Sequence, residues 1–310
     1  LRTQVIDQYR TEHKETIVST CGLLGVYRQV YYRSKQTLVK KQNIAKQVVD
    51  MVLEVRIRMP RIGTRKLYYL LQKQLNQLGI GRDKLFRILK ANHLLINPSK
   101  SYHITTDSHH RFRKHKNKVG GLLIKRADQV WVSDITYVGT RQKPFYLALV
   151  TDAYSKKIVG YNLSNSLNVE GSLNALEMAI KNKPKTTLPL IHHSDRGLQY
   201  CSNDYQKLLE INNIETSMTE KYDPYENAVA ERVNGILKPE FGIHKPLENM
   251  KLKKTLIKQS IDIYNQERPH LSNHMLTPNQ MHKQSEIKMK TYKSKNSLHR
   301  HQCKELILPL

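Results

Sequence analysis

The sequence predicts an all-helical N-terminal region followed by an α/β domain built on a mixed sheet. Three observations lead to this fold class. Up to about residue 96, apolar residues recur at three- and four-residue steps, which is the period of an amphipathic helix. After residue 126, three β-rich runs are separated by turn residues, and alternating strands and helices follow them. A three-strand meander continued in this way predicts a mixed sheet with helices on both faces.

The first region, residues 1–96, reads as a series of helices. Its opening stretch, IVSTCGLLGVYRQVYYRS, contains two glycines and predicts a helix-turn-helix whose second helix can enter a DNA major groove. Pro60 should end the next helix, and Thr64 is the expected N-cap of the one after it. Such helix pairs fit a DNA-binding module and a plain helical bundle equally well. Helices are expected over residues 17–34, 44–55, 63–79 and 81–95.

A basic linker is expected over residues 97–124, where the apolar periodicity disappears. Its densest part, HHRFRKHKNK, holds five Lys and Arg residues and no acid. Charge runs of this kind are usually solvated linkers. A flexible cationic arm can also follow a nucleic-acid backbone, because phosphate contacts then cost little ordering. Arg111, Arg113 and Lys114 are therefore candidate DNA-binding residues.

The α/β domain is expected over residues 125–285, and a basic C-terminal extension over residues 286–310. The first three strands are close enough in sequence to pair as an antiparallel meander. The apolar run LPLI then predicts a short buried strand, which ends at Asp195 just before a turn-forming glycine. Strands are expected over 128–140, 144–155, 156–165, 188–195 and 214–220, and helices over 169–182, 203–213, 227–241 and 254–266.

The charge of the chain points to nucleic acid as its partner. Lys and Arg number 52 against 26 Asp and Glu, which gives a net charge of +26. Solubility alone needs a net charge of only about 2 to 8 in a small domain, so a surface this basic is expected to lie against a polyanion. No apolar run approaches the roughly 18 residues of a membrane-spanning helix. The three cysteines lie far apart without a CxxC pair, which makes a zinc site on them improbable.

Three acids lie at positions where they could form a shared site. Asp134 lies inside the first strand, where burying a carboxylate is costly unless it is paired or bound to metal. Asp195 lies at the end of the fourth strand; if that strand pairs beside the first, the two carboxylates face each other across roughly 5 Å. Glu231 lies on a helix among small residues, and Lys238 returns to the same helical face seven residues later. Each acid alone is compatible with an ordinary surface charge, and Asp195 also with a turn cap.

Convergent carboxylates repel one another and therefore call for a cation. Hard oxygen ligands select Mg²⁺ or Mn²⁺ over zinc. Two such ions about 3.5 to 4 Å apart can activate a water or a 3′-hydroxyl and stabilise the leaving oxygen of a displacement at phosphorus. A nucleic-acid-binding chain with such a site is expected to perform phosphodiester chemistry.

The spacing of these residues resembles a known catalytic core. There are 35 residues between Asp195 and Glu231, and Lys238 follows seven residues after the glutamate. This pattern is similar to that of retroviral integrases and of bacterial insertion-sequence transposases of the second-frame (orfB) type. The blocks VWVSDITYV, DAYSKKIVGY, HHSDRGLQY, YENAVAERVNGILKPEF and YNQERPHLSNHMLTPNQ resemble successive motifs of those transposases, and the helical region resembles their helix-turn-helix segment.

This resemblance implies a ribonuclease-H-like fold, a mixed five-stranded sheet flanked by helices, for residues 125–285. It implies that Asp134, Asp195 and Glu231 are the catalytic, metal-binding triad. Lys238 would touch the DNA near the cleaved phosphate, and Asn227, also a candidate DNA-binding residue, would help to begin the helix of Glu231. One departure is visible: the family commonly has Asp-Asn-Ala where this chain has Glu226 before the asparagine. That acid is outside the triad, so the departure leaves the three expected metal ligands unchanged.

The resemblance also implies an activity and its partners. We expect a DDE transposase that cleaves and joins the DNA ends of an insertion sequence with Mg²⁺ or Mn²⁺, two ions per site. The expected partners are double-stranded DNA, further copies of the chain, and an upstream-frame product that is fused or separate; the chain begins with Leu1, which also fits a truncation. The expected location is the bacterial cytoplasm, at the nucleoid. The alternatives are a nuclease of the same fold without strand transfer and a catalytically silent DNA-binding regulator.

Overall fold

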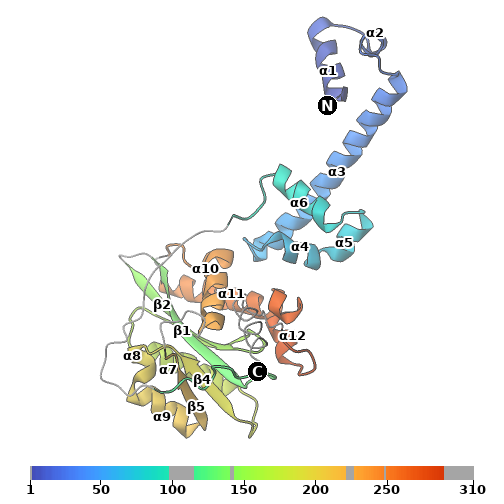
Figure 1. The fold of residues 1–310 in the computed structure, drawn as a ribbon. Helices are drawn as coiled ribbons and strands as arrows, with labels where there is room; N and C mark the ends of the chain where they lie inside the picture. The colour runs from blue at the N-terminus through green and yellow to red at the C-terminus, as the bar shows by residue number, and fades with distance from the viewer. Residues whose placement is uncertain (1, 98–114, 140–142, 221–226, 248, 290–310) are drawn as a thin grey trace, which may run out of the picture. The chain divides into compact units, whose positions relative to one another are not determined.

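The computed structural model describes residues 2–97, 115–139, 143–220, 227–247 and 249–289 (Figure 1). The chain divides into two compact units. The first comprises Leu1–Arg58 and Gly63–Ile96, and the second comprises Met59–Ile62 and Asn97–Leu310. Each unit is described by itself below.

The first unit is all helical, as the sequence predicts. At its N-terminal end, Ile6, Cys21 and Tyr31 form a small buried cluster, and the Tyr31 hydroxyl donates to Asp7 Oδ1 at 2.5 Å. At its other end, α6 packs against α3 and α4. The helices are α1 (Arg2–His13), α2 (Ile17–Leu23), α3 (Arg28–Arg58), α4 (Thr64–Leu70), α5 (Gln72–Gln77) and α6 (Arg82–Ala91).

Three helix boundaries in this unit differ from the prediction. The second helix of the helix-turn-helix and the amphipathic helix after it form one 31-residue helix, α3. No glycine or proline lies within it, so nothing interrupts the backbone hydrogen bonding. The helix expected over 63–79 is divided at Leu71, although hydrogen bonds from Leu71 N to Leu67 O and from Leu75 N to Leu71 O continue across the division. Its N-cap is Gly63 and not Thr64, which is the first helical residue.

The second unit is built on a mixed five-stranded sheet, which confirms the predicted fold class. The strand order is β3-β2-β1-β4-β5. The first three strands pair antiparallel as a meander, and β4 pairs parallel with both β1 and β5. This is the ribonuclease-H-like arrangement that the sequence resemblance implied. The strands are β1 (Val130–Gly139), β2 (Pro144–Asp152), β3 (Ile158–Ser164), β4 (Leu190–Ser194) and β5 (Ile214–Met218).

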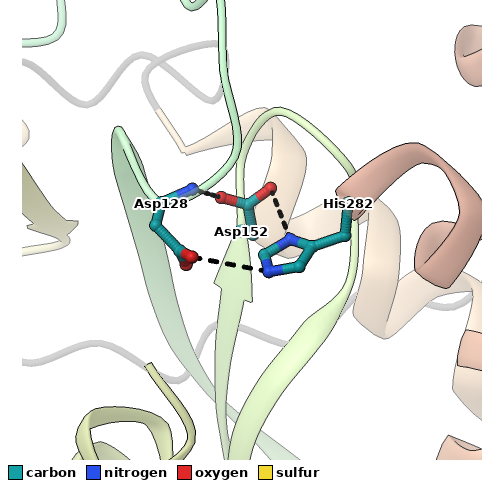
Figure 2. A group of neighbouring side chains, drawn as sticks. All are labelled: Asp128, Asp152 and His282. Atoms are coloured by element: carbon teal, nitrogen blue, oxygen red, sulfur yellow. Dashed lines mark hydrogen bonds and ion pairs between the residues drawn. The ribbon is translucent and has the colours of Figure 1, made fainter. Parts of the chain in front are cut away.

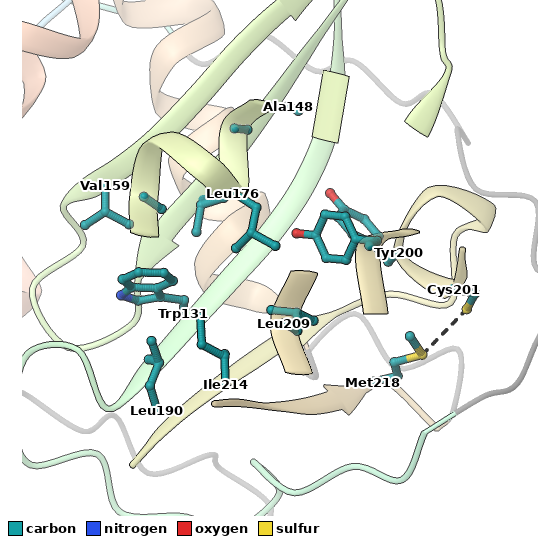
Figure 3. Close-up of a cluster of buried hydrophobic side chains, with 14 residues drawn as sticks. Trp131, Ala148, Val159, Leu176, Leu190, Tyr200, Cys201, Leu209, Ile214 and Met218 are labelled. Carbon is teal, nitrogen blue, oxygen red and sulfur yellow. Dashed lines mark hydrogen bonds between the residues drawn. The ribbon is translucent and has the colours of Figure 1, made fainter. Parts of the chain in front are cut away.

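Helices pack against the sheet and divide its buried side chains into two clusters. The larger cluster joins side chains of β1–β5 to α7, α8 and α9, and contains Trp131, Leu176 and Tyr205 (Figure 3). The smaller cluster joins Val130 and Val132 of β1 to Ala230 of α10. The helices are α7 (Val169–Asn182), α8 (Leu198–Cys201), α9 (Asn203–Ile211), α10 (Ala228–Phe241), α11 (Met250–Gln266), the 3₁₀ helix η1 (Leu271–Asn273) and α12 (Pro278–His282).

Within the described parts of the chain, no helix combines the length and the hydrophobicity that crossing a membrane requires. Cys21 and Cys201 are buried free thiols, one in each unit.

Candidate active site

Two of the predicted acids are brought together by the pairing of β1 with β4. The parallel register aligns Val130 with Ile191 and Val132 with His193. Two residues further along the same register, Asp134 is opposite Asp195, which directly follows the last residue of β4. Because side chains alternate along a strand, both carboxylates belong to the face that carries Val130 and Val132. That is the face covered by α10.

The third acid, Glu231, comes from α10 itself. Ala230, the residue before it, is buried against Val130 and Val132, and this contact fixes the first turn of the helix on β1. The Glu231 side chain lies in this first turn and is exposed. The fold therefore places the three acids on one face of the sheet: one within β1, one at the end of β4 and one on the covering helix.

Electrostatic coupling between the acids is visible at Asp134. Burial and the charge of Asp195 raise the pKa of Asp134 to about 7, and the charge of Glu231 adds to this effect. Hydrogen bonds from the Asn234 side chain and the Ile135 backbone oppose the shift. Burial also raises the pKa of Glu231. This cluster of like charges is one that a cation would relieve.

Asn234, which the sequence analysis did not single out, holds the Asp134 carboxylate. Its Nδ2 donates to Asp134 Oδ2 at 2.7 Å, and its side chain is buried. It lies three residues after Glu231, so it occupies the same side of α10 one turn further on. The amide therefore fixes the position of Asp134 relative to the helix that carries Glu231. No sequence signal indicates this bond, because the two residues are 100 positions apart.

Asn227 ties the beginning of the same helix to β1. It occupies the N-cap position of α10, but its side chain makes no capping hydrogen bond. Instead, its Nδ2 donates to the Ser133 carbonyl at 3.1 Å, and the side chain is buried. The two asparagines thus fasten α10 to consecutive residues of β1. The amide nitrogen of Asn227 is engaged within the protein, whereas the sequence analysis expected this residue to contact DNA.

Asp195 has a structural contact as well as its place beside Asp134. Its Oδ1 accepts a hydrogen bond from Gly197 N at 3.0 Å, which closes the turn after β4. A Cβ atom on residue 197 would lie 3.0 Å from the same oxygen, so the glycine leaves room for the carboxylate. Asp195 therefore caps this turn, and the turn contact is compatible with the predicted site role.

Of the remaining predicted DNA-binding residues, one lies near the acids and the others lie outside the described residues. Lys238 lies on α10 and is half-buried; burial lowers its pKa, and the charge of Asp134 opposes that effect. Lys238 is therefore within electrostatic range of the acids. Arg111, Arg113 and Lys114 lie outside the described residues, as does Glu226.

The carboxylates of the triad are not packed around a single point. Among the described residues, the group whose three ligand atoms all lie within 4.8 Å of one another is Asp128, Asp152 and His282 (Figure 2). Asp134, Asp195 and Glu231 interact electrostatically but do not form such a tight group. The sequence analysis did not identify the tight group, and the long separations between its members leave no local motif.

The other face of β1 supports the site through a neutral histidine. His192 on β4 is fully buried, and its Nε2 lies 2.7 Å from Ser133 Oγ and 2.9 Å from the Tyr205 hydroxyl. Burial and the neighbouring His193 lower its pKa to about 3, so the ring is uncharged at neutral pH. Hydrogen bonds from both faces thus hold the backbone and side chain of Ser133, the residue before Asp134.

Replacing Asn234 with Ala is expected to reduce metal-dependent DNA cleavage about 10- to 100-fold, which is the usual cost of losing a partner that orients a metal ligand. The Asp134 carboxylate loses its one side-chain hydrogen bond from α10. Cleavage rates measured under saturating DNA test this. Gly235→Ala is the matched control, because the new methyl group on the same helix meets nothing within 4 Å. Equal rates for both variants would mean that Asn234 does not orient the acid.

The fold and the three acids define the class of protein to which the chain is compared. It is an α/β core that carries carboxylates on β1, after β4 and on α10. Residues 125–224 and 212–278 match two family models, each described as an integrase core domain. Among solved structures, the chain is similar to the HTLV-2 integrase catalytic core in complex with magnesium (19% identity, TM-score 0.41, 51% of this chain and 97% of that one). It is also similar to a simian T-cell lymphotropic virus intasome chain (18% identity, TM-score 0.46, 74% and 78%).

Curated relatives come from bacterial insertion elements. An uncharacterized 31 kDa protein of insertion element IS600 from Shigella sonnei is 35% identical over 256 residues, which cover 81% of this chain and 92% of the relative. A transposase for insertion sequence element IS629 from Shigella sonnei is 36% identical over 147 residues, 47% of this chain and 49% of the relative. The chain belongs to the insertion-sequence transposase family with an integrase core domain.

Proposed function

We propose that this chain is a DDE transposase that cuts the DNA ends of an insertion sequence and joins them to a new site. The observation that carries the proposal is the convergence of Asp134, Asp195 and Glu231 on the α10 face of the sheet, where burial, together with the charges of the latter two, raises the pKa of Asp134. Family membership supports the same activity, because several curated relatives are named as transposases of insertion sequences. The net charge of +26 suits a DNA substrate.

The donor set fits divalent metal ions. It consists of carboxylates alone, which suits Mg²⁺ or Mn²⁺, and its mutual repulsion would be neutralised by bound cations. Asp134 and Asp195 would hold one ion, and Glu231 would complete the site of a second. Such ions supply activation of a water or a 3′-hydroxyl and stabilisation of the leaving oxygen. Asp134, Asp195 and Glu231 do not form one tight three-ligand group, which fits acids that share two metal sites better than acids that surround one ion.

The protein residues around the acids orient the reaction. Asn234 holds Asp134, and Asn227 keeps α10 against β1, so that Glu231 stays in register with the two aspartates. Lys238, on the same helix, would bind a DNA phosphate near the reacting bond. Arg111, Arg113 and Lys114 would contact the DNA backbone. The reaction is a direct displacement at phosphorus, in which a 3′-hydroxyl freed by hydrolysis attacks a second phosphodiester.

The proposed partners follow from this reaction. The chain would bind double-stranded DNA as both element end and target, with the first-unit helices α2 and α3 providing a helix-turn-helix. Because two ends of one element must be brought together, we propose that the chain acts as a homo-oligomer on DNA. An upstream-frame product would cooperate with it or be fused to it.

Joining of DNA strands is the test of this function. The chain is incubated with Mg²⁺, labelled DNA and unlabelled target DNA. The labelled DNA has the sequence of an end of the element that flanks the gene, and it carries a free 3′-hydroxyl. We expect labelled products longer than the substrate, formed by attack of that hydroxyl on the target. Hydrolysed products without joined ones would identify a nuclease, and DNA binding without either product would identify a regulator; both results contradict the proposal.

A further inference from the structure

Two buried aspartates lie close together away from the candidate active site. Asp128 is two residues before β1 and Asp152 is the last residue of β2, and the pairing of these strands places Asp152 opposite Trp131. Asp152 is fully buried and Asp128 is nearly so. Asp134 is six residues after Asp128, roughly 20 Å away along an extended chain. Two buried carboxylates without a cation would be costly, so the structure must compensate their charge locally.

Part of the compensation comes from hydrogen-bond donors on β1 and next to the ends of β1 and β2. Trp131 Nε1 donates to Asp128 Oδ1 at 2.8 Å, and the backbone N of Asp128 donates to Asp152 Oδ2 at 2.8 Å. Ser155 donates to Asp152 Oδ1 twice, from its backbone N at 2.7 Å and from its hydroxyl at 2.6 Å. Three of the four carboxylate oxygens are therefore engaged by these donors.

The fourth oxygen faces His282 of α12 (Figure 2). His282 Nε2 lies 3.5 Å from Asp128 Oδ2, and Nδ1 lies 3.6 Å from Asp152 Oδ1 and 3.0 Å from Ser155 Oγ. The single hydroxyl hydrogen of Ser155 is directed to Asp152, so Ser155 Oγ can only accept from the ring. An ionised carboxylate also only accepts. Both ring nitrogens therefore face acceptors, an arrangement that suits an imidazolium, which carries hydrogen on each nitrogen.

We propose that His282 is a largely buried clasp, charged at neutral pH, that fastens helix α12 to the β1–β2 end of the sheet, and that this cluster is filled by the imidazolium and not by a divalent ion. Two aspartates and a histidine have the composition of a metal site. Here, however, every carboxylate oxygen already faces a protein donor, and the cation that balances the pair is the ring itself. A metal ion would have to displace both the proton and these hydrogen bonds.

The electrostatics agree with this geometry. Burial opposes the charge on His282, but hydrogen bonds and charges of Asp128 and Asp152 outweigh it and raise the pKa to about 9. Burial would raise the pKa of Asp128, but the bonds from His282 and Trp131 outweigh it and lower the pKa. The other charged groups around the pair are Lys156 and Lys157, whose charges interact with Asp152, and Lys283, which repels Lys157.

Separate hydrogen bonds hold the chain that follows α12. Tyr154 donates to the Ile287 carbonyl at 2.5 Å, and Gln284 Nε2 donates to the Tyr154 hydroxyl at 3.0 Å. His274 Nε2 lies 3.1 Å from the Lys288 carbonyl. The segment over residues 284–288 is thereby held at the turn between β2 and β3. Losing the His282 charge should loosen α12, while these bonds remain.

The sign of the pH effect follows from the raised pKa. A protonated group that is stabilised in the folded state contributes its full stabilisation below the ordinary histidine pKa of about 6.5 and loses it as pH rises through about 9. The clasp is therefore closed at neutral pH. A shift of this size corresponds to an about 300-fold higher proton affinity in the folded protein.

Histidine NMR of the full chain tests the protonation. We expect one ring resonance to titrate near pH 9, to be absent in His282→Gln, and to persist in the control His13→Gln, which changes an exposed histidine of the first unit. A His282 ring that titrates near pH 6.5 or below would overturn the proposal. The wild-type titration decides this even if His282→Gln fails to fold, because the resonance can then be assigned from its coupling to neighbouring protons.

Calorimetry tests the exclusion of metal. Zn²⁺ and Mn²⁺ are titrated at neutral pH into a variant carrying Asp134→Asn and Asp195→Asn, which removes the candidate catalytic site. We expect no stoichiometric binding. One equivalent bound by this variant and lost on adding Asp152→Asn would show a metal site at the cluster and contradict the proposal. Neither measurement depends on strand joining, so this inference and the proposed function can fail separately.

Discussion

Asp195→Asn is expected to abolish metal-dependent cleavage and joining, with a loss of at least about a thousandfold, while DNA binding stays near that of the wild type. Removing one member of a group that acts as a unit typically costs this much or more. The fold should survive, because an asparagine oxygen can still accept the hydrogen bond from Gly197 N that Asp195 now accepts. The variant therefore removes the negative charge of residue 195 and keeps the hydrogen bond that closes the turn.

The measurement compares product formation with affinity for the same labelled DNA. Asp204→Asn is the matched control, because Asp204 is an exposed acid on α9, and it should cut and join like the wild type. Cleavage by Asp195→Asn within tenfold of the wild-type rate would show that this carboxylate is not part of the reaction centre. Lost DNA binding in the same variant would instead assign Asp195 to substrate recognition.

Gly160→Ala is expected to destabilise the second unit by about 3 kcal/mol, at the upper end of the usual cost of overpacking a core. A Cβ atom on Gly160 of β3 would lie 2.1 Å from the Ala175 carbonyl and 2.8 Å from Ala179 N of α7. Both contacts are with helix backbone, which cannot rotate away, so α7 would have to move off the sheet. The glycine therefore sets the distance between α7 and β3.

Urea unfolding followed by tryptophan fluorescence measures this effect in the full chain. Trp131 is the one tryptophan of the sequence, and it lies in the same buried cluster as Ala175 and Ala179 (Figure 3). The transition of Gly160→Ala should shift to lower urea concentration, whereas Gly235→Ala, with open space around it, should not be destabilised. An unchanged midpoint for Gly160→Ala would mean that α7 is not packed as closely as described.

The features predicted from sequence are those encoded by local patterns. Alternating and continuous apolar runs predicted the meander and the strand that ends before the turn at Asp195. The structure confirms the two pairings of the meander, β1 with β2 and β2 with β3, and also the pairing of β1 with β4 on which the approach of Asp134 and Asp195 depended. The run NAVAERVNGILKPEF predicted a helix that carries Glu231, and α10 is that helix. These signals lie within single elements or follow from the resemblance.

Other features depend on contacts between distant segments. The hydrogen bond between Asn234 and Asp134 requires α10 to lie against β1, and nothing in either segment encodes it alone. The clasp joins residues 128, 152 and 282, which lie in three separate segments of the chain. The length of α3 was missed for a different reason: its apolar stripe covers only the C-terminal half, while the absence of helix breakers extends the helix beyond that stripe.

The central claim is that Asp134, Asp195 and Glu231 together bind divalent metal, and Mn²⁺ calorimetry on the full chain tests it most directly. We predict binding by the wild type and by Asp204→Asn at neutral pH, with affinity at least about tenfold weaker in Asp134→Asn and in Glu231→Gln, as expected when a carboxylate ligand is lost. Isotherms of Asp134→Asn and Glu231→Gln that coincide with that of the wild type would contradict the claim.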